Sequence, residues 1–307
     1  MGDKTGIEWT DATWNPVTGC TKVSHGCKNC YAERDWNRMV HLPAYKGRAF
    51  TDVACHPERL IQPLRWKRPR RIFVNSMSDL FHESVPFEFI DQVFAAMAIC
   101  PQHTFQVLTK RPERMRDYTT RLSRSAKLLD DAARTMGYSF EHEGQYLVSF
   151  PLPNVWLGVS VEDQQTADER IPLLLQTPAA VRWVSAEPLL GTVDFRFTNG
   201  LVPGQDAADY RLDWVVVGGE SGPHARPMHP RWVRSIRLQC AREGIPFLFK
   251  QWGEWAPNCL CGREKACKTI ARPGPGFPGV MFRCGKKAAG RLLDGVLHDE
   301  YPKDKRQ

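Results

Sequence analysis

Three cysteines near the amino end are the residues of this chain best suited to chemistry. Cys20, Cys27 and Cys30 lie in the segment TGCTKVSHGCKNCY, separated by gaps of six and two residues. Cysteine thiolates bind iron–sulfur clusters, and four of them close a [4Fe–4S] cluster or a structural zinc site. Three thiolates on one loop leave one iron without a protein ligand. The spacing therefore predicts an open metal site with room for a substrate.

Other interpretations of these cysteines remain open on the residues alone. The loop can also form a zinc site, with a distant fourth ligand or with a nitrogen of His25, or it can hold free thiols. A disulfide is a weaker interpretation, because the chain begins Met-Gly-Asp-Lys with no apolar signal segment. We therefore expect a cytoplasmic protein in a reducing compartment. The isolated Cys55, Cys100 and Cys240 are predicted to be ordinary buried thiols.

The composition favours a globular enzyme with an acidic partner. The chain has 307 residues, 42% of them hydrophobic, and no apolar run approaches the roughly 20 residues that span a bilayer. A membrane protein is therefore not expected. The net charge of +8 favours nucleic acid as the partner, and a solvated basic surface is the alternative. Basic residues gather around Trp66, at Arg65, Lys67, Arg68, Arg70 and Arg71.

Short apolar runs alternate with amphipathic stretches, which predicts βα units and a parallel sheet. The predicted strands are Ala12–Asn15, Arg71–Asn75, Thr104–Thr109, Val155–Val161, Val181–Ser185, Trp214–Val217 and Pro246–Lys250. The predicted helices span 30–41, 86–99, 166–176 and 230–243. The expected fold is α/β, a partial or complete parallel (β/α) barrel. A segment near 119–150, with a helix at Ala126–Met136, is predicted to be an insertion.

Polar residues follow every predicted strand, where α/β barrels build their sites. The first strand is followed by the cysteine loop, and the other clusters are Asn75–Glu83, Thr109–Pro112, Ser160–Glu162, Ser185–Pro188, Gly218–Ser221 and Lys250–Gly253. A single cluster of this kind can be a helix cap. Recurrence after seven strands instead predicts one functional rim.

The chain resembles the phage-associated, three-Cys-motif radical-SAM-like family of the radical S-adenosylmethionine superfamily. The resemblance rests on the three-cysteine loop and on the segments Trp9–Pro16, Phe73–Phe81, Thr109–Arg114 and Gly285–Asp294, and it covers nearly the whole chain. The first cysteine gap of six residues is longer than the superfamily's commonest gap, and Asn29 precedes the third cysteine where an aromatic residue is usual. Here Tyr31 follows that cysteine instead.

The resemblance implies the radical SAM type of barrel and its chemistry. Cys20, Cys27 and Cys30 would hold a [4Fe–4S] cluster whose open iron binds S-adenosylmethionine, and an external electron donor would reduce it. Reductive cleavage would then allow hydrogen abstraction from a substrate. The residues expected to bind the cofactor are Tyr31, Asn75, Ser76, Ser78, Asp79, Ser160 and Glu162. The residues left for the substrate and catalysis are Lys110, Arg111, Glu187 and Glu220.

A second cysteine group lies in residues 256–307, which we expect to form a Cys-rich, basic extension after a barrel of residues 1–255. Its cysteines are Cys259, Cys261, Cys267 and Cys284. A segment this poor in apolar residues needs a cross-link, such as a bound metal, to hold a fixed structure. We therefore expect a second metal site, either zinc or an auxiliary iron–sulfur cluster, with free thiols as the alternative.

The sequence favours a radical SAM enzyme that modifies or repairs a nucleic-acid base. The basic residues and the abundant tryptophans, which can stack on an extruded base, support that substrate. Two alternatives stay open: a radical SAM enzyme acting on a protein or small metabolite, and a non-enzymatic, metal-stabilised nucleic-acid-binding protein.

Overall fold

A seven-stranded sheet forms the centre of the fold. We describe it in a computed structural model that covers residues 5–125, 127–146, 148–195, 211–257, 270–271 and 280–303. The strands are adjacent in chain order, and every neighbouring pair is parallel. They are β1 (Ala12–Trp14), β4 (Arg71–Val74), β5 (Thr104–Thr109), β8 (Val155–Ser160), β9 (Val181–Ala186), β10 (Trp214–Gly218) and β11 (Phe247–Gln251). Because β1 and β11 are the edges of this sheet, the fold is a partial (β/α) barrel.

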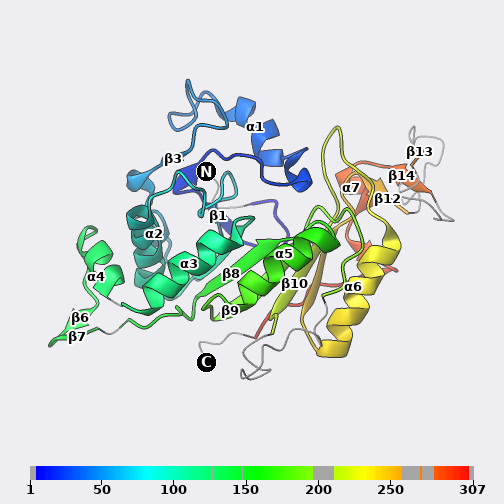
Figure 1. The fold of residues 1–307 in the computed structure, drawn as a ribbon. Helices are drawn as coiled ribbons and strands as arrows, with labels where there is room; N and C mark the ends of the chain where they lie inside the picture. The colour runs from blue at the N-terminus through cyan, green and yellow to red at the C-terminus, as the bar shows by residue number, and fades with distance from the viewer. Residues whose placement is uncertain are drawn as a thin grey trace.

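Helices between the strands cover one face of the sheet. They are α2 (Phe87–Ile99), α3 (Pro112–Ser123), α5 (Gln164–Leu175) and α6 (Pro230–Glu243). Figure 1 shows α3, α5 and α6 across that face. Proline occupies the first turn of α3 and α6, where its missing N–H is not needed. Asp163 caps α5 through the backbone N–H of Thr166 at 3.0 Å.

Side chains on the strands alternate between two cores. Outward residues such as Val74, Val107 and Leu157 pack in the main core beneath the helices. Inward residues form a second cluster on the concave face together with Trp9, which precedes β1. These residues are Phe73, Trp156, Val181, Trp183, Trp214, Val216 and Leu248. Gly158 leaves room for this cluster, because a Cβ there would lie 2.6 Å from the Trp183 ring.

Shorter elements complete the molecule. β2 (Val17–Thr18) and β3 (Ala54–Cys55) form an antiparallel pair across the cysteine loop and α1. The hairpins are β6 (Glu141–His142) with β7 (Gln145–Tyr146), and β15 (Leu292–Leu293) with β16 (Val296–Leu297). A small sheet joins β12 (Trp255–Ala256), β14 (Met281–Arg283) and β13 (Ile270–Ala271). The remaining helices are α1 (Tyr31–Met39), α4 (Lys127–Arg134), α7 (Lys286–Ala289) and the 3₁₀ turns η1 (His25–Cys27), η2 (Pro57–Arg59) and η3 (Pro63–Arg65).

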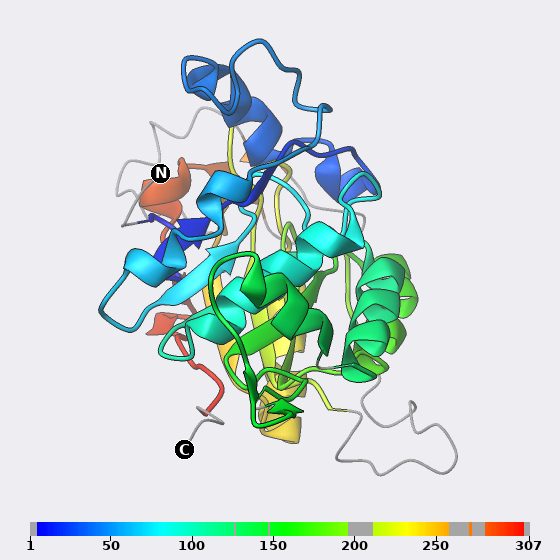
Figure 2. The same ribbon diagram turned by 90° about the vertical axis from the view of Figure 1, so that its left-hand side faces the viewer.

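The carboxyl-terminal segment folds back onto the barrel. Trp214 donates a hydrogen bond from Nε1 to the Glu300 carbonyl at 2.8 Å, and Tyr301 packs against the Trp214 ring at 5.3 Å between centroids. Phe249 donates its backbone N–H to the His298 carbonyl at 3.0 Å. Figure 2 shows α1 at one end of the sheet and the last described residues, which end at 303, at the other. Residues 298–301 of the predicted extension therefore pack against β10 and the edge strand β11.

The predicted elements agree closely with the structure. All seven strands are present within one residue at each end, and the predicted α/β class and partial barrel are confirmed. The predicted insertion contains α4, which packs on α2, followed by the β6–β7 hairpin. In the part of the chain that the structure describes, no helix has both the length and the apolar character to cross a membrane.

Candidate functional site

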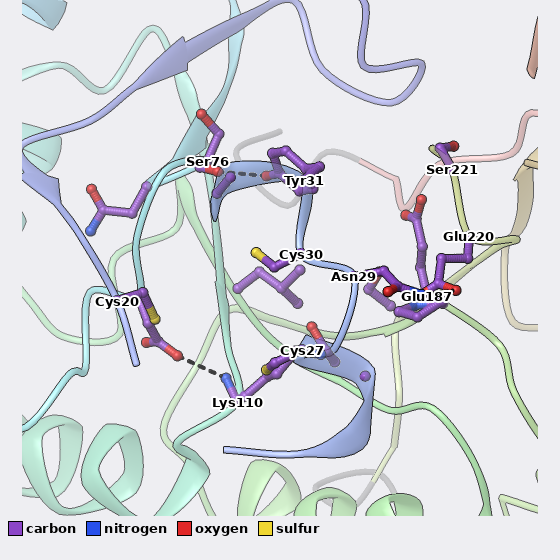
Figure 3. Close-up of a pocket in the computed structure, with 18 of the residues that line it drawn as sticks. Cys20, Cys27, Asn29, Cys30, Tyr31, Ser76, Lys110, Glu187, Glu220 and Ser221 are labelled. Carbon is purple, nitrogen blue, oxygen red and sulfur yellow. Dashed lines mark hydrogen bonds between the residues drawn. The ribbon is translucent and has the colours of Figure 1, made fainter. Parts of the chain in front are cut away.

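A cavity of about 380 Å³ opens at the carboxyl ends of the parallel strands. Its walls come from the cysteine loop, α1 and residues at or just after the carboxyl ends of β4, β5, β8, β9, β10 and β11. Figure 3 shows Cys20, Cys27 and Cys30 on one side and Glu187, Glu220 and Ser221 on the other. The structure thus brings the predicted rim together around one space.

The three cysteine thiols come from one loop that leads from β2 into α1. Cys20 donates its backbone N–H to the Phe50 carbonyl at 2.9 Å, Cys27 ends the turn η1, and Cys30 immediately precedes the first residue of α1. All three are free, partly buried thiols. Burial, with the nearby Asp79 carboxylate, raises the pKa of Cys20 to about 12, and burial also raises the pKa of Cys30. Binding a metal at Cys20 and Cys30 therefore requires displacing their protons.

Arg111 ties Cys20 to the ends of β4 and β5. Its Nη1 atom lies 3.8 Å from the Cys20 Sγ and 3.2 Å from Asp79 Oδ2, and its Nη2 donates to Thr21 Oγ1 at 2.9 Å. Its Nε donates to Glu83 Oε1 at 2.8 Å. The guanidinium is thus held by carboxylates while it contacts the first predicted ligand.

Both carboxylate oxygens of Asp79 accept hydrogen bonds from groups of the protein. Oδ1 accepts hydrogen bonds from Thr109 Oγ1 at 2.7 Å and from the Phe81 N–H at 3.0 Å. Oδ2 accepts from the Lys110 N–H at 3.0 Å and from Arg111. Asp79 lines the cavity, but these contacts favour a role in positioning Arg111.

Glu162 lies beneath the cysteine loop with no solvent exposure. It forms ion pairs with Lys110 and with Arg170, the latter at 3.2 Å. Burial alone would raise its pKa, but the two cations outweigh burial and hold the pKa of Glu162 below its usual value. Gly26 packs directly on this carboxylate, since a Cβ there would lie 2.4 Å from Oε1.

Glu220 holds the other side of the loop. Its Oε2 accepts hydrogen bonds from Asn29 Nδ2 at 3.0 Å and from Arg226 Nε at 2.9 Å. Arg226 also donates to the His25 carbonyl at 3.1 Å. Burial would raise the pKa of Glu220, and its hydrogen bonds with Arg226 and Asn29 lower it overall. The end of β10 is therefore fastened to the cysteine loop.

Glu187 and Lys250 form an ion pair that faces the cavity. Lys250 Nζ donates to the two carboxylate oxygens at 2.7 and 2.9 Å. Both side chains line the cavity and are only partly buried. This pair is accessible to a ligand in a way that Asp79 and Glu162 are not.

The predicted cofactor residues lie mainly near Cys30 and the end of β4. Tyr31 donates its hydroxyl to the Ser76 carbonyl at 2.6 Å (Figure 3), and the Ser78 hydroxyl donates to the Val17 carbonyl at 2.8 Å. Asn75 adopts a left-handed backbone with φ of 64°, which asparagine tolerates. Its buried Nδ2 has no partner in the described chain. Ser160, at the end of β8, also lines the cavity.

The donor set fits an iron–sulfur cluster in type and placement. Three thiols from one loop border one cavity, and an arginine contacts Cys20. Within the described ranges, no three His, Cys, Asp or Glu side chains meet closely enough to hold a single metal ion.

Two sequence predictions lie elsewhere. Cys259, Cys261 and Cys267 are outside the described residues, and Cys284 is a free, partly buried thiol. The basic run 65–71 precedes the amino end of β4, at the rim opposite the cavity. There Arg71 lies over the Tyr301 ring at 4.1 Å and Arg70 over Trp66 at 5.0 Å.

Four residues at the site were not singled out from the sequence. Lys250 was placed on the rim but given no role, and Asn29 was noted only as an unusual neighbour of Cys30. Arg170 and Arg226 were not recognised, although each pairs with a carboxylate only eight or six residues away in the chain, Glu162 and Glu220 respectively.

Comparisons with known proteins place the chain in a family. A family described as "Protein of unknown function (DUF5131)" matches residues 4–302. The chain belongs to this family. No curated protein matches it.

Solved structures of spore photoproduct lyase are similar to the chain at low identity. One variant of that enzyme has 11% identity and a TM-score of 0.39, over 88% of this chain and 67% of that one. The enzyme complexed with dinucleoside spore photoproduct has 10% identity and a TM-score of 0.38, over 91% of this chain and 70% of that one. The phage-associated family stays a prediction from sequence.

Proposed function

We propose that this protein is a radical S-adenosylmethionine enzyme whose substrate carries a nucleic-acid base. The observation that carries the proposal is the convergence of three thiols from one loop on a cavity at the carboxyl rim of a partial (β/α) barrel. Cys20, Cys27 and Cys30 would hold a [4Fe–4S] cluster, with S-adenosylmethionine at the open iron. When bound and reduced by an external donor, that pair supplies a radical able to take hydrogen from a C–H bond.

The chain's own residues position the site. Arg111 holds Cys20, while Gly26 on Glu162 and Asn29 on Glu220 fix the two sides of the loop. Asn75, with an unpartnered Nδ2, and Tyr31 are available to bind the cofactor near Cys30. The Glu187–Lys250 pair and the aromatic floor of Trp9 and Phe73 are available to orient the substrate.

Anaerobic reconstitution tests the proposal. The wild type should bind iron, absorb broadly in the visible range and release 5′-deoxyadenosine from S-adenosylmethionine under reduction. A variant with Cys20→Ala, Cys27→Ala and Cys30→Ala should lose all three properties. Cys55→Ala is the matched control, because Cys55 lies in β3 and does not line the cavity. Full iron content and full cleavage in the triple variant would refute the proposal.

The substrate class needs a separate measurement. Base modification or repair predicts product from an oligonucleotide under the same reducing conditions. Cleavage of S-adenosylmethionine without any change in nucleic acid would favour the protein or small-metabolite alternative. Iron binding without cleavage, together with nucleic-acid binding, would favour the non-enzymatic alternative.

A further inference from the structure

A second cavity adjoins the one that the cysteines border. Its volume is about 370 Å³, and its walls are Glu8, Gln251, Lys286, Lys287, Gly290 and Arg291. Gln251 and Lys286 line both cavities. A single ligand can therefore extend from the cysteine loop, past Gln251, to the carboxyl-terminal segment.

The two cavities differ in chemistry. The floor of the first includes Trp9 and Phe73, whose rings meet edge to face at 4.7 Å, together with Leu108. Its apolar and aromatic surface suits a planar ring. The second cavity carries three cationic side chains and one carboxylate, so it suits an anionic group.

The cations of the second cavity are not all neutralised. Lys286 pairs with Glu8 at 3.1 Å, and Arg291 pairs with Asp299 at 2.9 Å. Lys287 is exposed and forms no ion pair within the described chain. Its ammonium is therefore available to an incoming phosphate.

Gln251 lies where the cavities meet, and its side-chain amide oxygen accepts no hydrogen bond in the described chain. The side chain is 3% exposed, its Nε2 donates to Ser221 Oγ at 3.1 Å, and its Oε1 has no partner in the described chain. A buried acceptor without a partner is unfavourable, so native structures usually supply one. A ring N–H or amino group at this junction would satisfy it without breaking a protein hydrogen bond.

We infer that the substrate is a nucleotide unit that occupies both cavities. The base lies in the first cavity, near Trp9, Phe73 and Gln251, and its phosphate lies in the second, at Lys287 and Lys286. The inference rests on the proposed function, because it places the base beside the predicted radical source. It also assigns the phosphate contact to the cavity rim and not to the basic run 65–71, which lies at the opposite rim. The nucleotide can be free or part of a strand, since both present the same base and phosphate.

Binding to the reconstituted full-length protein tests the inference. The probes are the four nucleoside monophosphates, the four matching nucleosides and a fluorescent single-stranded oligonucleotide. Lys287→Gln should weaken nucleotide binding roughly three- to tenfold and reduce the salt slope for the oligonucleotide by about 0.7. Nucleoside binding should be unchanged, because a nucleoside has no phosphate. Lys67→Gln is the matched control: it removes the same charge from the opposite rim and should leave nucleotide affinity unchanged.

The different probes and variants show whether the ligand is a free nucleotide or a strand, and whether this inference or the proposed function is at fault. Tighter binding of the oligonucleotide than of any monophosphate indicates a strand, and the reverse order indicates a free nucleotide. Equal nucleotide affinity in Lys287→Gln and wild type, or a loss only in Lys67→Gln, overturns the inference. If no probe binds while iron loading and 5′-deoxyadenosine release persist, the inference fails and the proposed function stands. If nucleotides bind through Lys287 but the cysteine variants change nothing, the proposed function fails instead.

Discussion

Carboxylates at the strand ends are divided between two tasks. Asp79, Glu162 and Glu220 are buried, and cations or backbone donors of the protein occupy their oxygens. Glu187 is the partly exposed one, paired with Lys250 at the cavity wall. Contacts therefore favour Glu220 as a residue that positions the cysteine loop, although sequence alone grouped it with Glu187.

Replacing Glu220 tests this division. Glu220→Gln leaves the Arg226 guanidinium with a weaker partner, so we expect the free energy of unfolding to fall by about 1–3 kcal/mol. The loop should loosen, and reconstituted iron per chain should fall with it. Denaturant unfolding and iron analysis measure the two effects. Glu243→Gln, on the exposed end of α6, is the control and should change neither.

If Glu220→Gln keeps wild-type stability and iron but loses only substrate conversion, the positioning role is wrong. Glu220 would then belong with the substrate-binding residues predicted from sequence.

At the scale of elements, local signals predicted the sheet well. Short apolar runs marked the strands, and Pro86 and Pro230 marked the starts of α2 and α6. The two-residue strands of the small hairpins carry too little pattern to be recognised. The hydrogen bond that holds the cysteine loop to Glu220 could not be predicted either, because Asn29 and Glu220 are 191 residues apart in the chain.

The two rims of the barrel were predicted unequally well from the sequence. The parallel barrel correctly implied that the polar clusters after the strands would share one rim, and the cavity confirms that they do. The same logic places Arg71, at the first position of β4, at the other rim. Composition alone identified a basic run but could not show that it faces away from the cysteines.

The turn η1 should be unusually sensitive to one added methyl group. Gly26→Ala would place a Cβ 2.4 Å from Glu162 Oε1. Glu162 cannot move aside easily, because it is fully buried and held by Lys110 and Arg170. We expect the loop to shift and the reconstituted iron per chain to fall at least twofold.

Gly6→Ala provides the control for that substitution, since a Cβ at Gly6 has no neighbour within 4 Å. Iron analysis and the visible absorption spectrum of both variants make the comparison. Full iron loading in Gly26→Ala would show that the loop is not held against Glu162.

In the whole molecule, the cysteine loop lies over the carboxyl ends of the strands and contacts residues from both halves of the sheet. Arg111 and Glu162 hold it to the ends of β5 and β8, while Arg226 and Asn29 connect it to Glu220 after β10. Most of these hydrogen bonds and ion pairs depend on ionised carboxylates that connect the loop to residues distant from it in the sequence. The site and the global fold should therefore respond to acid together.

Acid unfolding tests this coupling. The folded-state pKa values of Glu162 and Glu220 lie below the ordinary value of 4.5, so the unfolded chain binds protons more readily. Their stabilisation is therefore fully present above pH 4.5 and is lost as the pH falls through the lower folded-state values. Glu83 also has a lowered pKa, but its side chain is 66% exposed and contributes less because solvent screens it.

We expect the free energy of unfolding in urea, followed by tryptophan fluorescence, to fall steeply as the pH drops from about 5 to about 3. In Glu220→Gln the decline should be shallower, because the Glu220 carboxylate no longer titrates, whereas Glu243→Gln should follow the wild type. Iron retention, measured over the same pH range before unfolding begins, should decrease earlier in Glu220→Gln than in the wild type, since that variant starts with one side of the loop already released. An unchanged pH slope in Glu220→Gln would mean that this carboxylate does not couple the loop to the stability of the barrel.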